Sequence, residues 1–369
     1  MIQLEISLVQ SSADRRDFLS FPYDIYKRDP YWVAPLRLDQ KALFDPAKHP
    51  FYLHGTIQCF LARCAGETVG RIAAILDPNY SVFHGEKAGF FGFLEMIEDQ
   101  AVVTGLLTAA RNWLHAQGAE VIRGPVNPST NYECGVLVDG FDSSPRIMMT
   151  YNPPYYGPLI EAAGLRKAKD LVAYDLPVAK ARADRVQALT DKAASNGVHL
   201  RTLRLEDYDN EVELAWGIYN SAWEKNWGFV PMTPAEFRHH GHELKQILIP
   251  DLAWIAEVDG QAVGFALAIP DINEALHHLR GRLLPFGLFK LLWYKRQIEY
   301  LRVIVLGVKH EFRPTPAAAA LYAALIRECA RLKFRGAECS WILEDNVLMR
   351  RSIEALGGTV YKTYRIYEF

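Results

Sequence analysis

The chain has 369 residues, of which 50% are hydrophobic and 23% are charged, and its formal net charge is −2 at pH 7. This composition excludes a disordered chain and argues against nucleic acid as the main partner. At about 100–200 residues per domain, the length indicates two domains, each able to bury a core.

The first half predicts a strand and then a helix that begins at Ser11 or Ser12, with Asp14 in its first turn as a capping signal. Two alternating strands follow as a hairpin. A helix, a strand, a short helix and a terminal strand complete this half. The predicted ranges of the longer elements are 2–9 for the first strand, 56–64 and 68–76 for the hairpin, 99–117 for the helix and 120–124 for the next strand.

The second half repeats this order. Its hairpin turns at Asp259-Gly260, the strongest short hairpin signal. The alanine- and charge-rich stretch between the halves predicts a linker helix. We expect a domain over residues 1–178, a linker helix over 179–196 and a domain over 197–369. The predicted elements of the second half are strands 253–258 and 262–269, a helix 316–334 and a strand 338–343.

The two halves are also copies of one sequence. Residues 60–79 align without a gap on residues 254–273, with eight identical positions. Further blocks follow in the same order in both halves. They are Gly118-Ala119-Glu120 with Gly336-Ala337-Glu338, Asn152 with Asn346, Ile160-Glu161-Ala162 with Ile353-Glu354-Ala355, Gly164 with Gly357, Lys169 with Lys362, and Tyr174 with Tyr367. The unit is too long for a solenoid repeat, so the chain contains a duplicated domain.

The element order of strand, helix, hairpin, strand, helix, strand, helix, strand resembles the GNAT acyltransferases. The resemblance is carried by residues 303–308, which lead into 311–329, and by the asparagine–helix–glycine segment 344–358. It covers both halves and implies an α/β fold with a mixed sheet, built as two tandem GNAT-like domains. The blocks DPYWVAPL, NWGFVP and SWILEDN are similar to a bacterial group that includes lipid N-acyltransferases of sphingolipid synthesis.

The resemblance implies an acyl-CoA donor whose pyrophosphate binds at the start of the helix after the fourth strand. The family pattern there is Arg/Gln-x-x-Gly-x-Gly/Ala, and this chain has Arg313 and Ala318 but Pro316 in place of the first glycine. Proline brings no N–H, so an ordinary proline-initiated helix is the alternative. The residues expected to bind CoA are Val308, Arg313, Thr315, Ala317, Ala318 and Asn346.

The first copy has Glu95, Glu98 and Asp99 at the corresponding place, with no arginine or glycine. Three carboxylates would repel a pyrophosphate. They also suit the start of a helix, whose dipole favours anions. We therefore expect the first copy to have lost the donor site.

Acyl transfer in this fold needs a base, a polarised thioester and in some members an acid. GNAT members often carry a tyrosine seven residues after the asparagine, but here Ile353 occupies that position, which leaves Tyr361, Tyr364 or no residue at all as the replacement. Glu344 and Asp345 are candidate bases, with a helix-capping turn as the alternative reading. The expected catalytic residues are Glu344, Asp345, Asn346 and Tyr361, with His310 and Glu311 in reserve.

A polar loop over residues 127–134 is richer in hydrogen-bonding groups than a connection needs, so we expect it to line an acceptor pocket at the domain interface, with a surface loop as the alternative. The expected substrate-binding residues are Trp223, Asn226, Trp227, Asn131, Tyr132, Glu133, Tyr155 and Tyr156. His239, His240 and His242 are more typical of a solvated helix face than of a metal site, and Cys134 lacks a cue for a histidine partner. We expect no metal.

Residues 279–298 combine apolar and aromatic side chains with five cations and no anion over 279–296. Such a segment suits the surface of anionic lipid or, alternatively, an interdomain packing helix. No apolar run reaches the roughly 18 residues of a membrane span, no signal peptide is evident, and five cysteines without a CxxC spacing fit a reducing compartment. We expect a cytoplasmic protein, peripheral at the inner membrane surface.

Together these features predict an N-acyltransferase that moves an acyl group from a CoA or carrier-protein thioester to an amine. With the family resemblance, the basic apolar segment favours an amphiphilic acceptor such as a sphingoid base, bound in a lipid-accepting groove. A non-catalytic GNAT-fold binding protein and an aminoacyl transferase of the cell-wall type are the alternatives.

Overall fold

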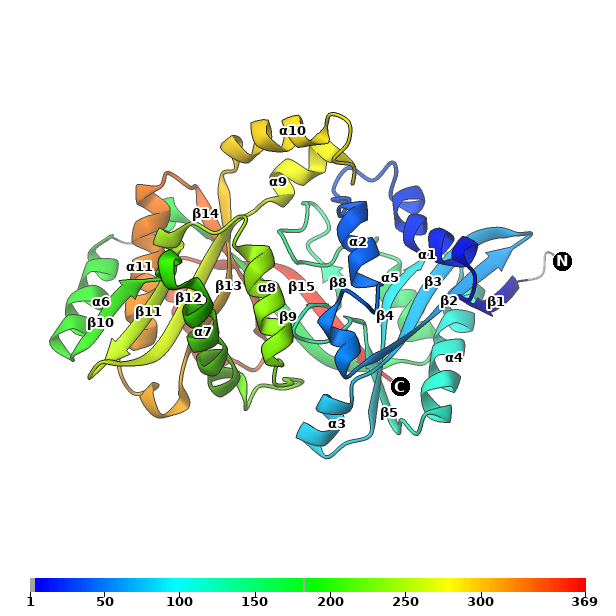
Figure 1. The fold of residues 1–369 in the computed structure, drawn as a ribbon, viewed down its shortest axis with the longest axis horizontal. Coiled ribbons are helices and arrows are strands. Elements are labelled where there is room, and N and C mark those ends of the chain that lie inside the picture. The colour runs from blue at the N-terminus through cyan, green and yellow to red at the C-terminus, as the bar shows by residue number, and fades with distance from the viewer. Residues whose placement is uncertain (1–3, 182) are drawn as a thin grey trace. The chain divides into compact units, whose positions relative to one another are not determined.

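The computed structural model describes residues 4–181 and 183–369, and the chain divides into two compact units (Figure 1). The first unit holds the chain up to Leu171, together with Leu276–Leu291 and Lys362–Phe369. The second holds Val172–Ala275 and Leu292–Tyr361. Each unit combines helices with part of a mixed sheet, as the predicted α/β class requires. Among the described residues, no helix has both the length and the hydropathy needed to cross a bilayer.

The first unit has the strand order β1-β2-β3-β4-β5-β15-β9, in which β4 and β5 are parallel. The predicted capping box is present at Ser11, whose side chain and main chain both bond Asp14. Hairpin β2–β3 and helix α4 match their predicted ranges within one residue. The elements up to β9 are β1 Leu4–Leu8, α1 Ser12–Ile25, α2 Arg37–Leu43, β2 Thr56–Cys64, β3 Glu67–Leu76, α3 Pro78–His84, β4 Ala88–Met96, α4 Gln100–Ala116, β5 Val121–Gly124, β6 Val126–Asn127, β7 Glu133–Cys134, β8 Val136–Asp139, α5 Tyr156–Ala162 and β9 Arg166–Pro177.

The expected cluster of three carboxylates at the start of α4 is only partly correct. Asp99 is the N-cap, and its side chain accepts the Ala101 N–H at 2.7 Å. Glu95 instead lies inside β4, because the apolar strand continues to Met96. Its partly exposed carboxylate accepts hydrogen bonds from the hydroxyl groups of Tyr26 and Tyr156. Glu95 therefore belongs to β4 and does not face a phosphate site at that helix.

The second unit has the strand order β9-β14-β13-β12-β11-β10, with β13 and β14 parallel. Its hairpin turns at Asp259 and Gly260, which have φ of 51° and 75° as a type I′ turn requires. Helix α6 lies in the stretch expected to be a linker helix. The elements after β9 are α6 Ala183–Ser195, β10 Val198–Thr202, α7 Tyr208–Trp223, α8 Pro234–Leu244, β11 Ala253–Val258, β12 Gln261–Pro270, α9 Asn273–Leu276, α10 Gly287–Tyr294, β13 Tyr300–Val308, α11 Ala317–Arg331, β14 Gly336–Leu343, α12 Val347–Ala355 and β15 Thr359–Glu368.

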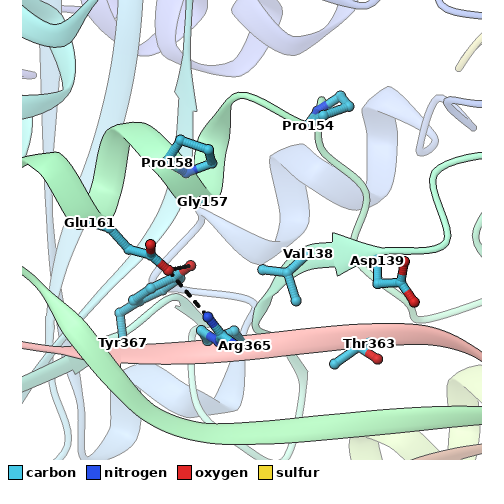
Figure 2. Close-up of a pocket in the computed structure, with 9 residues that line it drawn as sticks. All are labelled: Val138, Asp139, Pro154, Gly157, Pro158, Glu161, Thr363, Arg365 and Tyr367. Atoms are coloured by element: carbon cyan, nitrogen blue, oxygen red, sulfur yellow. Dashed lines mark hydrogen bonds and ion pairs between the residues drawn. The ribbon is translucent and has the colours of Figure 1, made fainter.

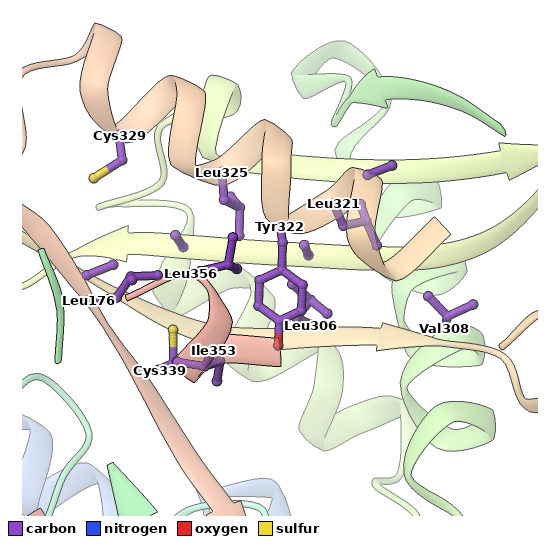
Figure 3. Packing of buried hydrophobic residues seen from close by; sticks show 14 of the residues in the cluster. Leu176, Leu306, Val308, Leu321, Tyr322, Leu325, Cys329, Cys339, Ile353 and Leu356 are labelled. Carbon is purple, nitrogen blue, oxygen red and sulfur yellow. The ribbon is translucent and has the colours of Figure 1, made fainter. Parts of the chain in front are cut away.

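Helix α11 packs on β11, β12 and β13, and its apolar residues form the core of the second unit together with those of α12 and β14 (Figure 3). Leu321 and Leu325 come from α11, Ile353 from α12, Leu356 from the C-cap of α12 and Cys339 from β14. All are 6% exposed or less. Because side chains alternate across a strand, the neighbours of these core positions on β13 and β14 point to the opposite face of the sheet.

The closing strands of the two copies are exchanged. Tyr174, on β9 of the first copy, lies in the second unit and donates its hydroxyl to Glu354 of α12 at 2.7 Å. Tyr367, on β15 of the second copy, lies in the first unit and donates to Glu161 of α5 at 3.1 Å. Both tyrosines are fully buried. Tyr174 corresponds to Tyr367 and Glu161 to Glu354 in the repeat, so each copy supplies the strand that completes the other unit.

Candidate active site in the second unit

The parallel strands β13 and β14 separate in the middle of the second unit. They pair only from Tyr300 opposite Gly336 to Val303 opposite Cys339, although both strands continue beyond that point. On its other side β13 carries a bulge, because the register with β12 shifts and leaves Ile304 without an opposite residue. A bulge turns main-chain groups out of the ladder. The gap between β13 and β14 and the bulge at Ile304 therefore lie at the same place along β13.

Helix α11 follows β13 through the short turn His310–Phe312. Pro316 is its N-cap residue, and the helix begins at Ala317. The N–H groups of the first helical turn have no partner within a helix, and together with the helix dipole they suit an anion. Arg313 lies just before them, where its Nη2 donates to the carbonyl oxygen of Ala222 at 2.7 Å. These groups fit the pyrophosphate of CoA, although Pro316 supplies no donor.

The C-terminal end of α7 lies against the same part of β13. A Cβ atom on Gly307 would lie 2.3 Å from the Trp223 ring, so this indole rests directly on the strand backbone. Lys225 contacts His310 at 3.3 Å. The structure therefore brings together Trp223, Val308, which follows Gly307, and Arg313. Asn226 and Trp227 lie in the turn that follows α7, where the Asn226 N–H donates to the Trp223 carbonyl at 2.8 Å.

A buried polar cluster lies on the face of β13 and β14 opposite α11, and we call it the Glu338 cluster. Glu338 is 1% exposed and faces Arg302 across the strand pair, 3.5 Å from its Nε. Ser340 donates to Glu338 at 2.5 Å, and Arg302 Nε donates to Ser340 Oγ at 3.1 Å. The Tyr361 hydroxyl also donates to Glu338. The cluster adjoins the last paired residues before the strands separate.

Burial raises the pKa of Glu338, while the nearby Arg302 and the hydrogen bonds from Ser340 and Tyr361 act in the opposite direction. A carboxyl group with a raised pKa is better matched to proton transfer near neutral pH. Sequence reasoning missed Glu338 as a site residue, although it identified Tyr361. The available signals were Arg302 within an otherwise apolar strand and a glutamate within the next one.

The predicted catalytic residues Glu344, Asp345 and Asn346 follow the end of β14 at Leu343. Asn346 is the N-cap of α12, and its side chain accepts the Met349 N–H at 3.2 Å. The capping alternative is thus the one observed for Asn346. Arg350 donates to the Glu344 carbonyl oxygen at 2.9 Å. Proton transfer by Glu344 or Asp345 stays a prediction.

Tyr361 and Tyr364 are the two candidates to replace the acid that Ile353 does not supply. Ile353, at the usual tyrosine position, is fully buried in the core of the second unit. Tyr361 lies in that unit, whereas Tyr364 lies in the first unit and is also fully buried. Of the two tyrosines considered as replacements for the missing acid, only Tyr361 belongs to the Glu338 cluster.

The remaining predicted substrate residues belong to the first unit. Asn131 and Tyr132 form a turn after Ser129, and Tyr132 packs on His49 with ring centres 5.5 Å apart. Glu133 starts β7. Tyr155 donates to the Met96 carbonyl at 2.8 Å, and the buried Tyr156 hydroxyl contacts Glu95. Their part in an acceptor pocket stays a prediction.

In the first unit the parallel strands β4 and β5 separate in the same way, but another segment of the same unit lies against the bulge. β4 pairs with β5 only over Ala88–Phe90, and the register with β3 then shifts at Phe93. The Phe93 N–H donates to Asn127 Oδ1 at 2.6 Å. The Val126 carbonyl lies so close to Gly92 that a Cβ atom there would be 1.8 Å away. The bulge amide of the first copy is therefore already satisfied internally.

The first unit also contains a pocket of about 360 Å³, shown in Figure 2. Arg365 crosses it and pairs with Glu161 at 3.2 Å and with Asp170 at 2.8 Å. Two carboxylates therefore neutralise this cation, which makes the pocket a poor anion site. Its lining residues are Val138, Asp139, Pro154, Gly157, Pro158, Glu161, Thr363, Arg365 and Tyr367.

The histidines of α8 have a carboxylate partner that the sequence reading did not anticipate. The exposed Glu243 lies 3.3 Å from His239 and 3.6 Å from His240, and these two histidines hold its pKa well below the usual range. Within residues 4–181 and 183–369, no group of three or more histidine, cysteine or acidic side chains is placed to hold a metal ion.

Comparison with known proteins agrees with this architecture. No protein-family model matches the chain. The chain is 37% identical over 372 residues to the bacterial ceramide synthase of Caulobacter vibrioides, which covers 99% of this chain and 97% of that protein. It is also 37% identical over 366 residues to the protein YghO of Escherichia coli, which covers 96% of this chain and 92% of that protein.

Among solved structures, a tandem GNAT protein from the clavulanic acid biosynthesis pathway is similar over 100% of this chain and 98% of its own, with a TM-score of 0.57 and 15% identity. A GCN5-related glucosamine N-acetyltransferase region of a fungal multi-domain β-N-acetylglucosaminidase has a TM-score of 0.60 and 16% identity, covering 100% of this chain and 38% of that one. These likenesses show the fold. The chain has a tandem GNAT fold and belongs to the family of the bacterial ceramide synthase.

Proposed function

We propose that the protein transfers an acyl group from a thioester to the amino group of a sphingoid base, and that the transfer takes place in the second unit. A ceramide is the amide formed in that reaction, and the Caulobacter relative is named for it. The observation that carries the proposal is the separation of β13 and β14 at the Ile304 bulge, directly before helix α11.

In this proposal the donor thioester lies between the separated strands, and main-chain groups near Ile304 polarise its carbonyl. The pyrophosphate of an acyl-CoA lies at the start of α11, next to Arg313. The first unit is a weaker candidate because Asn127 already bonds its bulge amide. A carrier-protein thioester would use the same gap, so the donor class is tested with both substrates.

The Glu338 cluster supplies the acid–base chemistry of the proposal. The free amine attacks the thioester carbonyl carbon, a C–N bond forms, and the C–S bond breaks as the thiolate leaves. An ammonium substrate loses two protons overall. One passes through the Tyr361 hydroxyl to Glu338, and the other goes to the leaving thiolate. Glu344 and Asp345 remain the second choice of base.

The test compares Glu338→Gln and Tyr361→Phe with Glu120→Gln, the internal equivalent of Glu338 on the surface of the first unit. We expect Glu338→Gln to lower kcat by about 10²–10⁴ with little change in the donor KM, because it removes a proton-transfer group. Glu120→Gln should behave like the wild type. Acylation of a long-chain amine is followed by mass spectrometry with acyl-CoA and with acyl carrier protein. Equal turnover of Glu338→Gln and Glu120→Gln would contradict the assignment.

Two observations favour a non-catalytic binding protein instead. Pro316 replaces a glycine whose N–H would contact the phosphate, and Ile353 replaces the usual tyrosine. Native mass spectrometry of the purified protein separates the two cases. An enzyme should exchange a bound acyl thioester for free CoA when amine is added, whereas a binding protein should retain it.

A further inference from the structure

The segment around α10 exposes a concentration of large apolar side chains, which we call the α10 surface. Its members are between 49% and 77% exposed. Elsewhere in the described residues, large apolar side chains with comparable exposure occur singly or as neighbouring pairs, as is normal for a protein surface. A contiguous patch is different and marks an interaction site. The α10 surface comprises Leu284, Phe286, Leu288, Phe289, Leu292 and Trp293.

The apolar side chains lie on one side of the helix. Successive residues turn by about 100° in an α-helix, so Leu288, Phe289, Leu292 and Trp293 share one face. Gly287 and Leu291, on the other side, are less exposed. The segment is anchored before the helix, where Leu279 is buried and the Arg37 N–H donates to the Gly281 carbonyl at 3.1 Å. The protein thus holds an apolar face outward.

The formal charges within residues 275–298, which include α10, are all positive. Between Glu274 and Glu299 the sequence contains no acidic residue. Arg282, Lys290, Lys295 and Arg296 are exposed, and none of them forms an ion pair with any residue in the described part of the chain. Lys290 lies within α10, and Lys295 and Arg296 follow its last residue. A partner that fits this surface is apolar in its interior and negatively charged at its boundary.

We propose that the α10 surface docks the protein on an anionic lipid bilayer. Leucine, phenylalanine and tryptophan side chains enter the boundary between headgroups and acyl chains, while the cations attract anionic headgroups. Eight residues are too few to cross the bilayer. The proposal deepens the proposed function and rests on it in one respect: a long-chain amine resides in a bilayer, so an enzyme that acylates it gains from working at that surface.

Sedimentation with phosphatidylcholine vesicles, with or without phosphatidylglycerol, tests the docking. The wild-type protein should sediment with vesicles that contain phosphatidylglycerol at low salt and be released at high salt. Phe289→Asp with Trp293→Asp, and separately Lys290→Glu with Arg296→Glu, should each weaken binding by about tenfold or more, since each cation contributes about fivefold. Val82→Asp and Lys48→Glu are matched controls, because both side chains are highly exposed outside the α10 surface.

Thermal unfolding must show that every variant folds. Equal sedimentation of the α10 variants and the controls would overturn the proposal. So would a change of oligomeric state in Phe289→Asp with Trp293→Asp without lipid, since the surface would then join two copies of the chain.

Activity separates failure of docking from failure of the proposed function. The α10 variants should keep wild-type turnover on a short, water-soluble amine and lose it only on long-chain amine presented in vesicles. Glu338→Gln should lose both activities and still sediment. Loss of the short-amine activity in the α10 variants would assign the segment to the active site and refute a purely docking role.

Discussion

Glu120 and Glu338 occupy the same position in the two copies, yet their surroundings differ completely. Glu120 pairs with Lys87 at 2.8 Å on the surface, where both side chains are more than two-thirds exposed. Exposed pairs of this kind contribute little to stability. Glu338 is buried, in contact with Arg302, Ser340 and Tyr361. The second copy thus buries a carboxyl group, whose desolvation is costly unless partners such as these compensate it.

The raised pKa of Glu338 makes a prediction about stability. The unfolded chain releases this proton near the ordinary value of 4.5, and the folded protein releases it only at higher pH. Between these values the folded state holds more protons, so the free energy of unfolding falls as pH rises. Glu338→Gln removes that contribution. Its melting temperature relative to the wild type should therefore increase from about pH 4.5 towards neutrality.

The control for this measurement is Glu120→Gln. Its melting temperature relative to the wild type should not increase with pH in this way. Glu338→Gln also loses its contacts with Arg302, so its melting temperature is expected to be lower at every pH. The informative quantity is the change with pH. A constant difference across the range would mean that Glu338 does not titrate with a raised pKa.

At the scale of elements, the hairpins and the long helices lie within a few residues of their predicted ranges. Their signals are local: the Asp259-Gly260 turn, alternation in the strands and the capping box at Ser11. The exchange of β9 and β15 was not predictable from such signals. Both strands end a copy with the same spacing of lysine and tyrosine, and main-chain pairing does not depend on which copy supplies the strand.

The exchange predicts a crossed response to two matched substitutions. Tyr174→Phe removes a hydrogen bond to Glu354, and Tyr367→Phe removes one to Glu161. Each loss should cost about 0.5–1.5 kcal/mol of local stability. Amide hydrogen exchange should therefore quicken in α12 when Tyr174 of the first copy is changed, and in α5 when Tyr367 of the second copy is changed. If each substitution loosened the helix of its own copy instead, the exchange of strands would be wrong.

At the scale of the whole molecule, the chain is a duplication for which we propose a single donor site, in the second unit. Both units keep the separated strands and the bulge, but Asn127 bonds the Phe93 amide in the first unit. We expected the first copy to have lost the donor site because three carboxylates stood at the start of α4. Glu95, however, lies within β4 and not at the start of that helix. The filled bulge is a more direct physical reason for the same expectation.

We therefore predict that each chain binds one donor molecule. Calorimetry with CoA should give a single site, and Arg313→Glu should weaken binding by about tenfold or more, because a charge-assisted contact is replaced by repulsion. Arg16→Glu, on an exposed position of α1, is the control. Two equal sites in the wild type, or unchanged affinity in Arg313→Glu, would contradict it.

The duplication, the order of elements and the GNAT resemblance follow from the sequence alone, because identities repeated in the same order, turn dipeptides and hydrophobic periods can be read along the chain without knowing which segments pack together. The burial of Glu338, the filling of the first bulge by Asn127 and the exchange of β9 with β15 were decided only by the tertiary structure. Each depends on residues that are distant in the chain and that are chosen by packing, and the two copies are too similar for local sequence to select between them.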